Sequence, residues 1–355
     1  MKIIYTGLKF TNYNHQLGLS FEHNNFYESL RKLPETEVIY FPYERILELG
    51  RDKGNEELLN LIRSEKPDLF FAFMFTDELI PEILDEIKKY TKSIAWFSDD
   101  HWRFDNYSRY YAPHFSWVIT TYSKAVDRYK KIGIKNIIHS QWAANVNIYG
   151  SIIESVKKEI DISFVGAWSR PRQKIISALK SKGINVECYG IGWPNGRISS
   201  DKMIEIFSSS KISLALNPTP GYLNINSLGR LFLRRSMDKI VPDFHIWRNF
   251  KSFLHRGIAQ IKARHFEISA CGGFLMTSMA DNLGDYYKIG EEIVAYKNTN
   301  ELIEKIIYYL KNDEERKKIA EAGYERTIKD HTYNKRFEDI FRMVSRGFID
   351  KILKI

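Results

Sequence analysis

The chain has 355 residues, a formal net charge of +9 at pH 7 and only two cysteines, Cys188 and Cys271. This length favours two domains over one ordinary core, and the cysteine count argues against a secreted disulfide scaffold, so we expect a reducing cytosol. No run of about 18 apolar residues suggests a membrane span. No Cys-x-x-Cys or His-x-x-x-His cluster suggests a metal site. The positive charge favours an anionic partner, such as a nucleotide, a phosphorylated lipid, a membrane surface or a nucleic acid.

Strands alternate with helices along the first half, which is typical of a parallel sheet covered on both faces. Short runs of β-branched and aromatic residues predict the strands, and longer amphipathic stretches predict the helices. We expect strands at 2–6, 37–41, 68–73, 93–97, 116–120 and 136–139, and helices at 21–33, 56–64, 81–90 and 124–131.

The same alternation restarts in the second half, so the sequence predicts two α/β domains with a boundary near 145–158. In open α/β sheets ligands bind at the carboxyl ends of the strands, which predicts a site in a cleft between the domains. We expect strands at 161–165, 185–189, 212–216, 274–277 and 293–296, and helices at 173–182, 201–209, 264–271, 301–312, 314–322 and 333–355.

A basic and an acidic residue, Arg264 and Glu267, lie three positions apart in one expected helix, which Gly272 and Gly273 end. Residues three apart project from the same helical face, so both can meet one ligand. A guanidinium suits a diphosphate, and a carboxylate suits the hydroxyls of a ribose. The pair fits a nucleoside diphosphate carrying a further group, although a solvated ion pair on an ordinary helix gives the same pattern.

The stretch 224–262 is long for a connection between a strand and a helix. Its basic residues are interleaved with aromatic and aliphatic ones at helix-like spacing. That composition fits a helix lying on an anionic membrane surface, a nucleic-acid surface, or a helical excursion packed on its own domain. The basic residues are Arg230, Arg234, Arg235, Lys239, Arg248, Lys251 and Arg256, against Asp238 and Asp243.

Several short motifs occur in an order that resembles a known family. They lie at 20–26, 96–102 and 141–145 in the first half, and at 162–166, 189–197, 262–274, 290–293 and 331–336 in the second. In these segments the chain resembles the CgeB-like branch of the bacterial group-1 glycosyltransferases. The string at 262–274 is the most specific of them, and the match is densest in the second half. The resemblance implies a GT-B fold, in which two Rossmann-like α/β domains face a central cleft.

The resemblance also implies a division of labour between the domains. Residues 1–150 would bind the acceptor, and residues 151–330, with 224–262 as a basic aromatic insertion, would bind the nucleotide-sugar. The final helix, 331–355, would pack back on the first domain.

The donor site that the resemblance implies uses side chains and no metal ion. Glu267 would bind the ribose of the nucleotide, and Arg264, Arg170 and Arg172 would neutralise the diphosphate. Positive groups preset where the leaving diphosphate gains charge lower the barrier to transfer. The remaining donor-side residues are Gly166 and Gly272–Gly273, with backbone close to the donor, and Trp193, beside the nucleotide base. The acid that many relatives carry eight residues before the ribose-binding acid is Ala259 here, so the resemblance predicts neither the sugar nor the anomeric outcome.

Asp99, Asp100 and His101 follow the expected strand 93–97 and so lie at its carboxyl end. Any of them can take a proton from an acceptor hydroxyl, and such a base favours inversion of the anomeric centre. The alternative is an aspartate cap at the start of the next helix. We assign Glu22 and Asn25, near the first helix, to the acceptor side.

The sequence therefore predicts a metal-independent hexosyl- or pentosyltransferase that uses a nucleotide-sugar as substrate and needs no cofactor. Its acceptor would be a glycan, lipid-linked or other hydroxyl in cell-surface glycan assembly. The enzyme would be cytoplasmic and peripheral at the inner membrane face. Two alternatives stay open: a glycosyltransferase acting on modified DNA bases, and a non-catalytic protein that binds a nucleotide or a glycan.

Overall fold

The computed structural model describes residues 1–150, 157–218 and 228–352, with side chains up to residue 345. The chain forms two compact units, each assembled from separate stretches of sequence. Unit 1 comprises Met1–Gln141, Tyr222–Arg256 and Arg336–Ile355, and unit 2 comprises Trp142–Gly221 and Gly257–Lys335.

Unit 1 is built on a six-stranded sheet in the order β2-β1-β3-β4-β5-β6, and every neighbouring pair is parallel. The central strand β3 reads Leu-Phe-Phe-Ala-Phe and is buried along its whole length, as expected for a parallel sheet covered on both faces. The strands are β1 (Lys2–Thr6), β2 (Glu37–Tyr40), β3 (Leu69–Phe73), β4 (Lys92–Phe97), β5 (Trp117–Thr120) and β6 (Ile137–His139).

The helices of unit 1 follow the expected alternation, and residues 21–30 are helical where a helix is expected at 21–33. There the chain forms a π-helical turn and then the short helix α1. The helices are α1 (Glu28–Leu30), α2 (Tyr43–Leu49), α3 (Arg51–Glu65), α4 (Pro81–Ile87), α5 (Asp100–Arg103), α6 (Arg109–Tyr111) and α7 (Ala125–Lys131). The π-helical turns are His23–Tyr27 and Phe104–Ser108, and the 3-10 turns are Thr11–Tyr13, His15–Leu17 and Ala112–His114.

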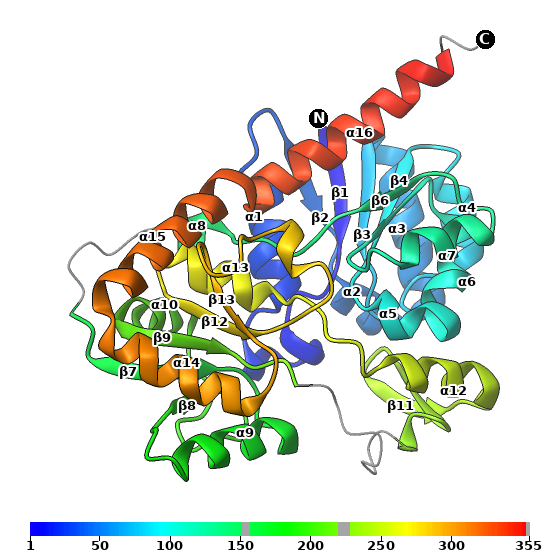
Figure 1. Ribbon diagram of the computed structural model, residues 1–355. Helices are drawn as coiled ribbons and strands as arrows, with labels where there is room; N and C mark the ends of the chain where they lie inside the picture. Colours follow the sequence, from blue (N-terminus) through cyan, green and yellow to red (C-terminus); the bar gives the residue numbers. More distant parts are fainter. Residues whose placement is uncertain (151–156, 219–227, 353–355) are drawn as a thin grey trace. The chain divides into compact units, whose positions relative to one another are not determined.

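Unit 2 carries a five-stranded parallel sheet in the order β13-β12-β9-β7-β8 (Figure 1). The strands are β7 (Ile160–Val165), β8 (Glu187–Tyr189), β9 (Ser210–Ala215), β12 (Leu275–Ser278) and β13 (Val294–Tyr296). The helices are α8 (Val146–Tyr149), α9 (Arg170–Lys180), α10 (Ser200–Ser209), α13 (Ala263–Ala270), α14 (Thr299–Lys311) and α15 (Asp313–Asp330), with a 3-10 turn at Leu283–Asp285. Two parallel-sheet α/β units are the fold class that the sequence predicts.

The last helix, α16 (Tyr333–Ile352), begins in unit 2 and continues as part of unit 1. In unit 1 its Phe337 is fully buried. The Phe337 ring packs edge-on against Phe26 and Phe71, with ring centroids 5.6 Å and 5.9 Å apart. The C-terminal helix therefore completes the aromatic core of the N-terminal sheet.

The connection between β9 and α13 adds a third element to unit 1. It forms an antiparallel hairpin, β10 (Leu233–Ser236) with β11 (Lys239–Pro242), followed by helix α12 (Ile246–His255). The expectation of helix-like structure through 224–262 is wrong for residues 233–242. Apolar and basic residues there pair across two strands around a turn in which Met237 has a left-handed φ of 49°.

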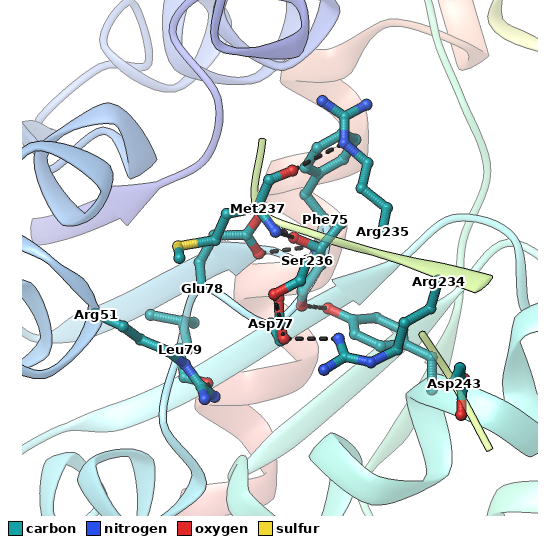
Figure 2. A network of polar contacts seen from close by, with 12 residues as sticks. Arg51, Phe75, Asp77, Glu78, Leu79, Arg234, Arg235, Ser236, Met237 and Asp243 are labelled. Carbon is teal, nitrogen blue, oxygen red and sulfur yellow. Dashed lines mark hydrogen bonds and ion pairs between the residues drawn. The ribbon is translucent and has the colours of Figure 1, made fainter. Parts of the chain in front are cut away.

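Asp77, in the loop after β3, fastens this hairpin to unit 1 (Figure 2). Its Oδ2 accepts hydrogen bonds from Arg234 Nη1 at 2.7 Å and from Ser236 Oγ at 2.8 Å. The backbone N–H of Met237 donates to Thr76 Oγ1 at 2.9 Å. These contacts fix one strand of the hairpin against the loop that follows the central strand.

Candidate functional site

Helix α13 brings Arg264 and Glu267 together as the sequence predicts. Arg264 Nη1 lies 2.6 Å from Glu267 Oε2; the Glu267 side chain is 5% exposed and that of Arg264 is 25% exposed. The Arg264 guanidinium also stacks on Phe207 of α10, 5.3 Å from the ring centroid, and contacts Met203 Sδ. The pair is a buried carboxylate that fixes a partly exposed guanidinium, so an anion can reach Arg264 from solvent.

The polar residue that anchors α13 is His265, which the sequence analysis did not single out. His265 is fully buried and bonds Thr277 of β12 through Nε2 at 2.9 Å, while its Nδ1 lies 2.9 Å from the Lys262 carbonyl oxygen. Burial lowers the pKa of His265 to about 4, so the ring is neutral at pH 7. Because a neutral ring can donate from one nitrogen and accept at the other, His265 ties the start of the helix to the sheet.

Gly272 and Gly273 are required by the backbone geometry at the end of helix α13. Gly272 has a left-handed φ of 65°, and the N–H of Gly273 donates to the Ile268 carbonyl at 3.0 Å, which closes the helix end. A Cβ on Gly273 would lie 3.0 Å from Ile268 Cγ2 and 3.2 Å from the Phe207 carbonyl oxygen. Both glycines therefore end α13 where it packs closely on its neighbours.

The loop after β7 is held by Trp193. Its indole Nε1 donates to the Gly166 carbonyl at 2.9 Å, and its ring is buried in the core of unit 2. Gly190 (φ 129°) approaches the same carbonyl so closely that a Cβ there would lie 2.3 Å from the Gly166 oxygen. Trp193 therefore anchors the Gly166 loop to the core of unit 2.

Arg170 and Arg172 begin helix α9, after the N-cap Ser169, whose side chain accepts from Arg172 N. Arg170 is exposed. Arg172 Nε donates to the Leu216 carbonyl at 3.0 Å and Nη1 donates to the Ala167 carbonyl at 2.6 Å. Burial, and then the charge of Arg264, lower the pKa of Arg172. The structure therefore places Arg172 within electrostatic reach of Arg264, while Arg172 also braces the loop after β7.

An acidic residue from another loop lies beside Ala259, the position at which the resemblance leads us to expect an acid. The backbone N–H of Asp281 donates to the Ala259 carbonyl at 3.2 Å. Asp281 Oδ2 is buried without a hydrogen-bond partner among the described residues. A buried carboxylate oxygen in this state is expected to meet a polar ligand. Asp281 was missed because nothing in the sequence links it to Ala259.

The three candidate bases have different surroundings in unit 1. Asp100 is completely buried, accepts a hydrogen bond from Tyr129 Oη at 2.8 Å, and has its pKa raised by that burial. His101 is 6% exposed and packs edge-on against Tyr122. Asp99 is half-buried and occupies the N-cap position of α5 without a side-chain capping bond. Asp99 is therefore the most accessible of the three, and its carboxylate is not used as a cap.

Glu22 and Asn25 lie in the segment that follows β1. Asn25 is buried and its Nδ2 donates to the Phe21 carbonyl at 3.1 Å. Glu22 is half-buried. Removal from water, with smaller contributions from the carboxylates of Glu44 and Glu78, raises the pKa of Glu22 from 4.5 to about 7. A carboxyl group with that pKa suits proton transfer at neutral pH, a role beyond the acceptor-side position expected from the sequence.

Helix α12 turns its polar side inward and its apolar side outward. Asn249 and Ser252 are each 3% exposed, and Asn249 Oδ1 accepts a hydrogen bond from Asn106 Nδ2 at 3.1 Å. Trp247 is 69% exposed and Phe244, just before the helix, is 85% exposed. A large exposed apolar patch marks an interaction surface. We call this patch the apolar surface; it comprises Phe232, Leu233, Ile240, Phe244, Ile246, Trp247, Phe250 and Leu254.

One segment of the chain matches a known protein family. A family model described as glycosyl transferase-like matches residues 170–342, which include α9 and the Arg264–Glu267 pair. TarM is similar in structure with a TM-score of 0.54 at 10% identity, over 82% of this chain and 58% of that chain. The fold is that of the GT-B glycosyltransferases.

Two further solved structures match over nearly their whole length. The lipopolysaccharide outer core galactosyltransferase WaaB, in its apo form, gives a TM-score of 0.56 at 11% identity, over 98% of this chain and 100% of that one. Anabaena HepE in complex with UDP-glucose gives 0.57 at 10% identity, with the same coverage of 98% and 100%. No curated protein matches the sequence.

The described residues contain neither a candidate metal-binding group nor a candidate membrane-spanning helix. In 1–150, 157–218 and 228–352 no group of three or more His, Cys, Asp or Glu residues could hold a metal ion. Within those same ranges, every helix is too short or too polar to cross a bilayer.

Proposed function

We propose that this protein is a glycosyltransferase that moves a hexose or pentose from a nucleotide-sugar to a hydroxyl acceptor. The observation that carries the proposal is the Arg264–Glu267 pair, in which a buried carboxylate holds a guanidinium that is one quarter exposed. This arrangement suits a ligand that presents ribose hydroxyls and a diphosphate together. The pair lies in the segment that matches the glycosyl transferase-like family.

In this proposal cationic side chains stabilise the leaving diphosphate without a metal ion. Arg264 and Arg172 are close enough to repel each other electrostatically. A diphosphate bound between them would relieve that repulsion. Arg170 and the N-terminus of α9 extend the positive region. Preset positive groups act most strongly where negative charge grows in the transition state.

We also propose that Asp281 contacts the donor sugar. Its backbone lies beside Ala259 and one of its carboxylate oxygens is buried without a partner among the described residues. A sugar hydroxyl could donate to that oxygen. The acid would then come from the loop after β12 and not from the start of α13.

Acceptor activation is proposed for unit 1, with Asp99 and Glu22 as the two candidate bases. Asp99 favours the charged forms of Arg230 and Arg256, so it lies among cations. The pKa of Glu22 is raised to about 7, which suits a base at neutral pH. Asp100 and His101 are proposed to hold the loop, because their side chains are enclosed.

The proposed setting is cell-surface glycan assembly at the cytoplasmic face of the inner membrane. Support comes from the apolar surface, which is flanked by exposed cations at Lys239, Arg248 and Lys251. Aromatic side chains beside basic ones are typical of segments that lie on anionic bilayers.

The test of the donor site is thermal unfolding of the full chain with nucleoside diphosphates and nucleotide-sugars. A ligand at about a hundred times its dissociation constant adds roughly 2.7 kcal/mol to the free energy of unfolding. We expect one nucleotide to raise the Tm of the wild type and not that of Glu267→Ala, and its sugar to be released on long incubation. If the protein is folded and no nucleotide raises its Tm, the proposal is overturned.

A further inference from the structure

Three arginines gather around one tryptophan of unit 1, although they are far apart in the sequence. The guanidinium carbons of Arg103, Arg230 and Arg256 lie 5.9 Å, 5.3 Å and 5.5 Å from the centroid of the Trp102 ring system. Arg103 belongs to α5, Arg230 precedes the hairpin, and Arg256 is the C-cap of α12. We call these four residues the Trp102 cluster.

Among the described residues, the arginines of this cluster outnumber the acids that act on them. Partial burial, then the neighbouring Arg230, lower the pKa of Arg256 to about 10. Partial burial, then Arg103, lower the pKa of Arg230. Asp99 is the carboxylate that favours the charged forms of Arg230 and Arg256. Asp100 is a second acid beside the cluster: burial raises its pKa, and Arg103 is among the groups that lower it. Two acids among three guanidiniums leave an excess of positive charge.

Other partners account for only part of this excess. Arg103 Nη2 donates to the Phe75 carbonyl at 2.6 Å, which is a neutral acceptor. Asp105, further along the chain, lies 2.5 Å from Arg128 and 3.9 Å from His255, so it is already engaged. Half-buried cations are stable when an anion pairs with them. The geometry therefore favours an anion with several oxygens.

We propose that the Trp102 cluster binds a phosphate group carried by the acceptor. Guanidiniums gathered beside an aromatic ring keep several N–H donors, and their planar fork matches the oxygens of a phosphate. Trp102, Arg103 and Arg256 are half-buried and Arg230 is exposed, so a ligand can enter from solvent. The role in the acceptor rests on the proposed function, because Asp99, a candidate base, lies among these arginines.

The apolar surface suggests what else the acceptor carries. Arg256 directly follows α12, whose Trp247, Phe250 and Leu254 face outward. A phosphate bound at the Trp102 cluster would thus lie at one end of a helix that exposes apolar side chains to solvent. A phosphate ester with an alkyl chain fits both features.

The experiment is calorimetric titration of the full chain with decyl phosphate, below its micelle concentration, and with inorganic phosphate. We expect Arg230→Gln/Arg256→Gln to weaken decyl phosphate binding at least tenfold. Two controls should keep wild-type affinity: Arg248→Gln, which removes a charge of α12 that stacks on Tyr110 instead, and Arg264→Gln, on the donor side. The single change Arg230→Gln, at an exposed position, gives the same readout if the double variant does not fold.

The two probes separate the sources of phosphate. Much tighter binding of decyl phosphate than of inorganic phosphate supports a lipid acceptor, and equal binding supports a soluble phosphorylated one. The proposal is overturned if neither probe binds the wild type, or if Arg264→Gln abolishes binding while the double variant keeps it. The nucleotide-dependent Tm shift of the double variant reports on the donor site separately, so failure of one site does not imply failure of the other.

Discussion

Arg264 and Glu267 form an ion pair in which the acid is the buried member, with Nη1 2.6 Å from Oε2. A guanidinium beside a buried carboxylate is held in one rotamer, so its remaining donors point in a fixed direction. The Arg264 side chain at the start of α13 is therefore preorganised. A diphosphate that binds it would not have to order the side chain first.

Glu267→Gln keeps the shape of the side chain and removes the charge. Because the partner is only partly exposed, we expect the free energy of unfolding to fall by about 1–3 kcal/mol, and nucleotide affinity to fall at least tenfold. Chemical denaturation and nucleotide titration measure the two effects. The matched control is Glu205→Gln, which breaks the exposed pair with Lys202 at the same spacing and should cost about 0–1 kcal/mol. Equal losses in both variants would contradict a special role for Glu267.

Gly190→Ala should disturb the Gly166 loop. The new Cβ would lie 2.3 Å from the Gly166 carbonyl oxygen at a φ of 129°, so the loop must move, at a cost of roughly 2–4 kcal/mol. Gly196→Ala is the control, since its φ is 62° but nothing lies within 4 Å of its Cβ, and only about 1 kcal/mol is expected. Thermal unfolding compares the variants. Similar Tm values for both would show that the contact is easily relieved.

Glu22 should make stability depend on pH. Its pKa is about 7 in the folded chain against an ordinary value of 4.5, so folding favours the protonated carboxyl. The stability that this group contributes is fully present below pH 4.5 and is lost as pH rises through 7, by up to about 3 kcal/mol. Relative to Glu22→Gln, the wild type should therefore become less stable across this window.

The measurement is urea denaturation between pH 4 and pH 8, with the exposed Glu56→Gln as the control that keeps the wild-type slope. If Glu22 is also the base, Glu22→Gln should lower kcat by orders of magnitude with unchanged donor affinity. If Asp99→Asn has that effect and Glu22→Gln does not, the base is Asp99.

Phe244→Ser/Trp247→Ser should weaken binding to anionic vesicles, because two exposed aromatic side chains would leave the bilayer interface. Co-sedimentation with phosphatidylglycerol vesicles is expected to show binding by the wild type and a loss of at least fivefold in the variant. Ile307→Ser, which removes a similarly exposed apolar residue of α14, should bind as the wild type does. Retention of binding by the double variant would place the membrane contact elsewhere.

The fold was largely predictable because the strands of both sheets are short, apolar and separated by amphipathic helices. The hairpin β10–β11 was not, since its turn at Met237–Asp238 lacks the Asn-Gly or Asp-Gly signal. Its position is fixed by Asp77 and Thr76. Those partners are more than 150 residues away, so local patterns cannot reveal them.

The candidate site also has features that local sequence predicts and features that it does not. Arg264 and Glu267 were predictable because one helix turn brings them together. Sequence cannot say which of Asp99 and Asp100 is enclosed, because adjacent residues have the same local signal; burial against Tyr129 decides it. Trp102 and Arg256 meet only after the chain returns to unit 1, so no motif could have linked them.

The return of the chain to unit 1 bears on how the protein is synthesised. Unit 1 needs Tyr222–Arg256 and Arg336–Ile355 as well as the first 141 residues. A ribosome that has completed the N-terminal sheet has not yet made Phe337, so the faces of Phe26 and Phe71 that it covers stay bare until Phe337 has been made. An isolated fragment of residues 1–150 should therefore aggregate. Transferring unit 1 to another protein would require three separate segments and not one.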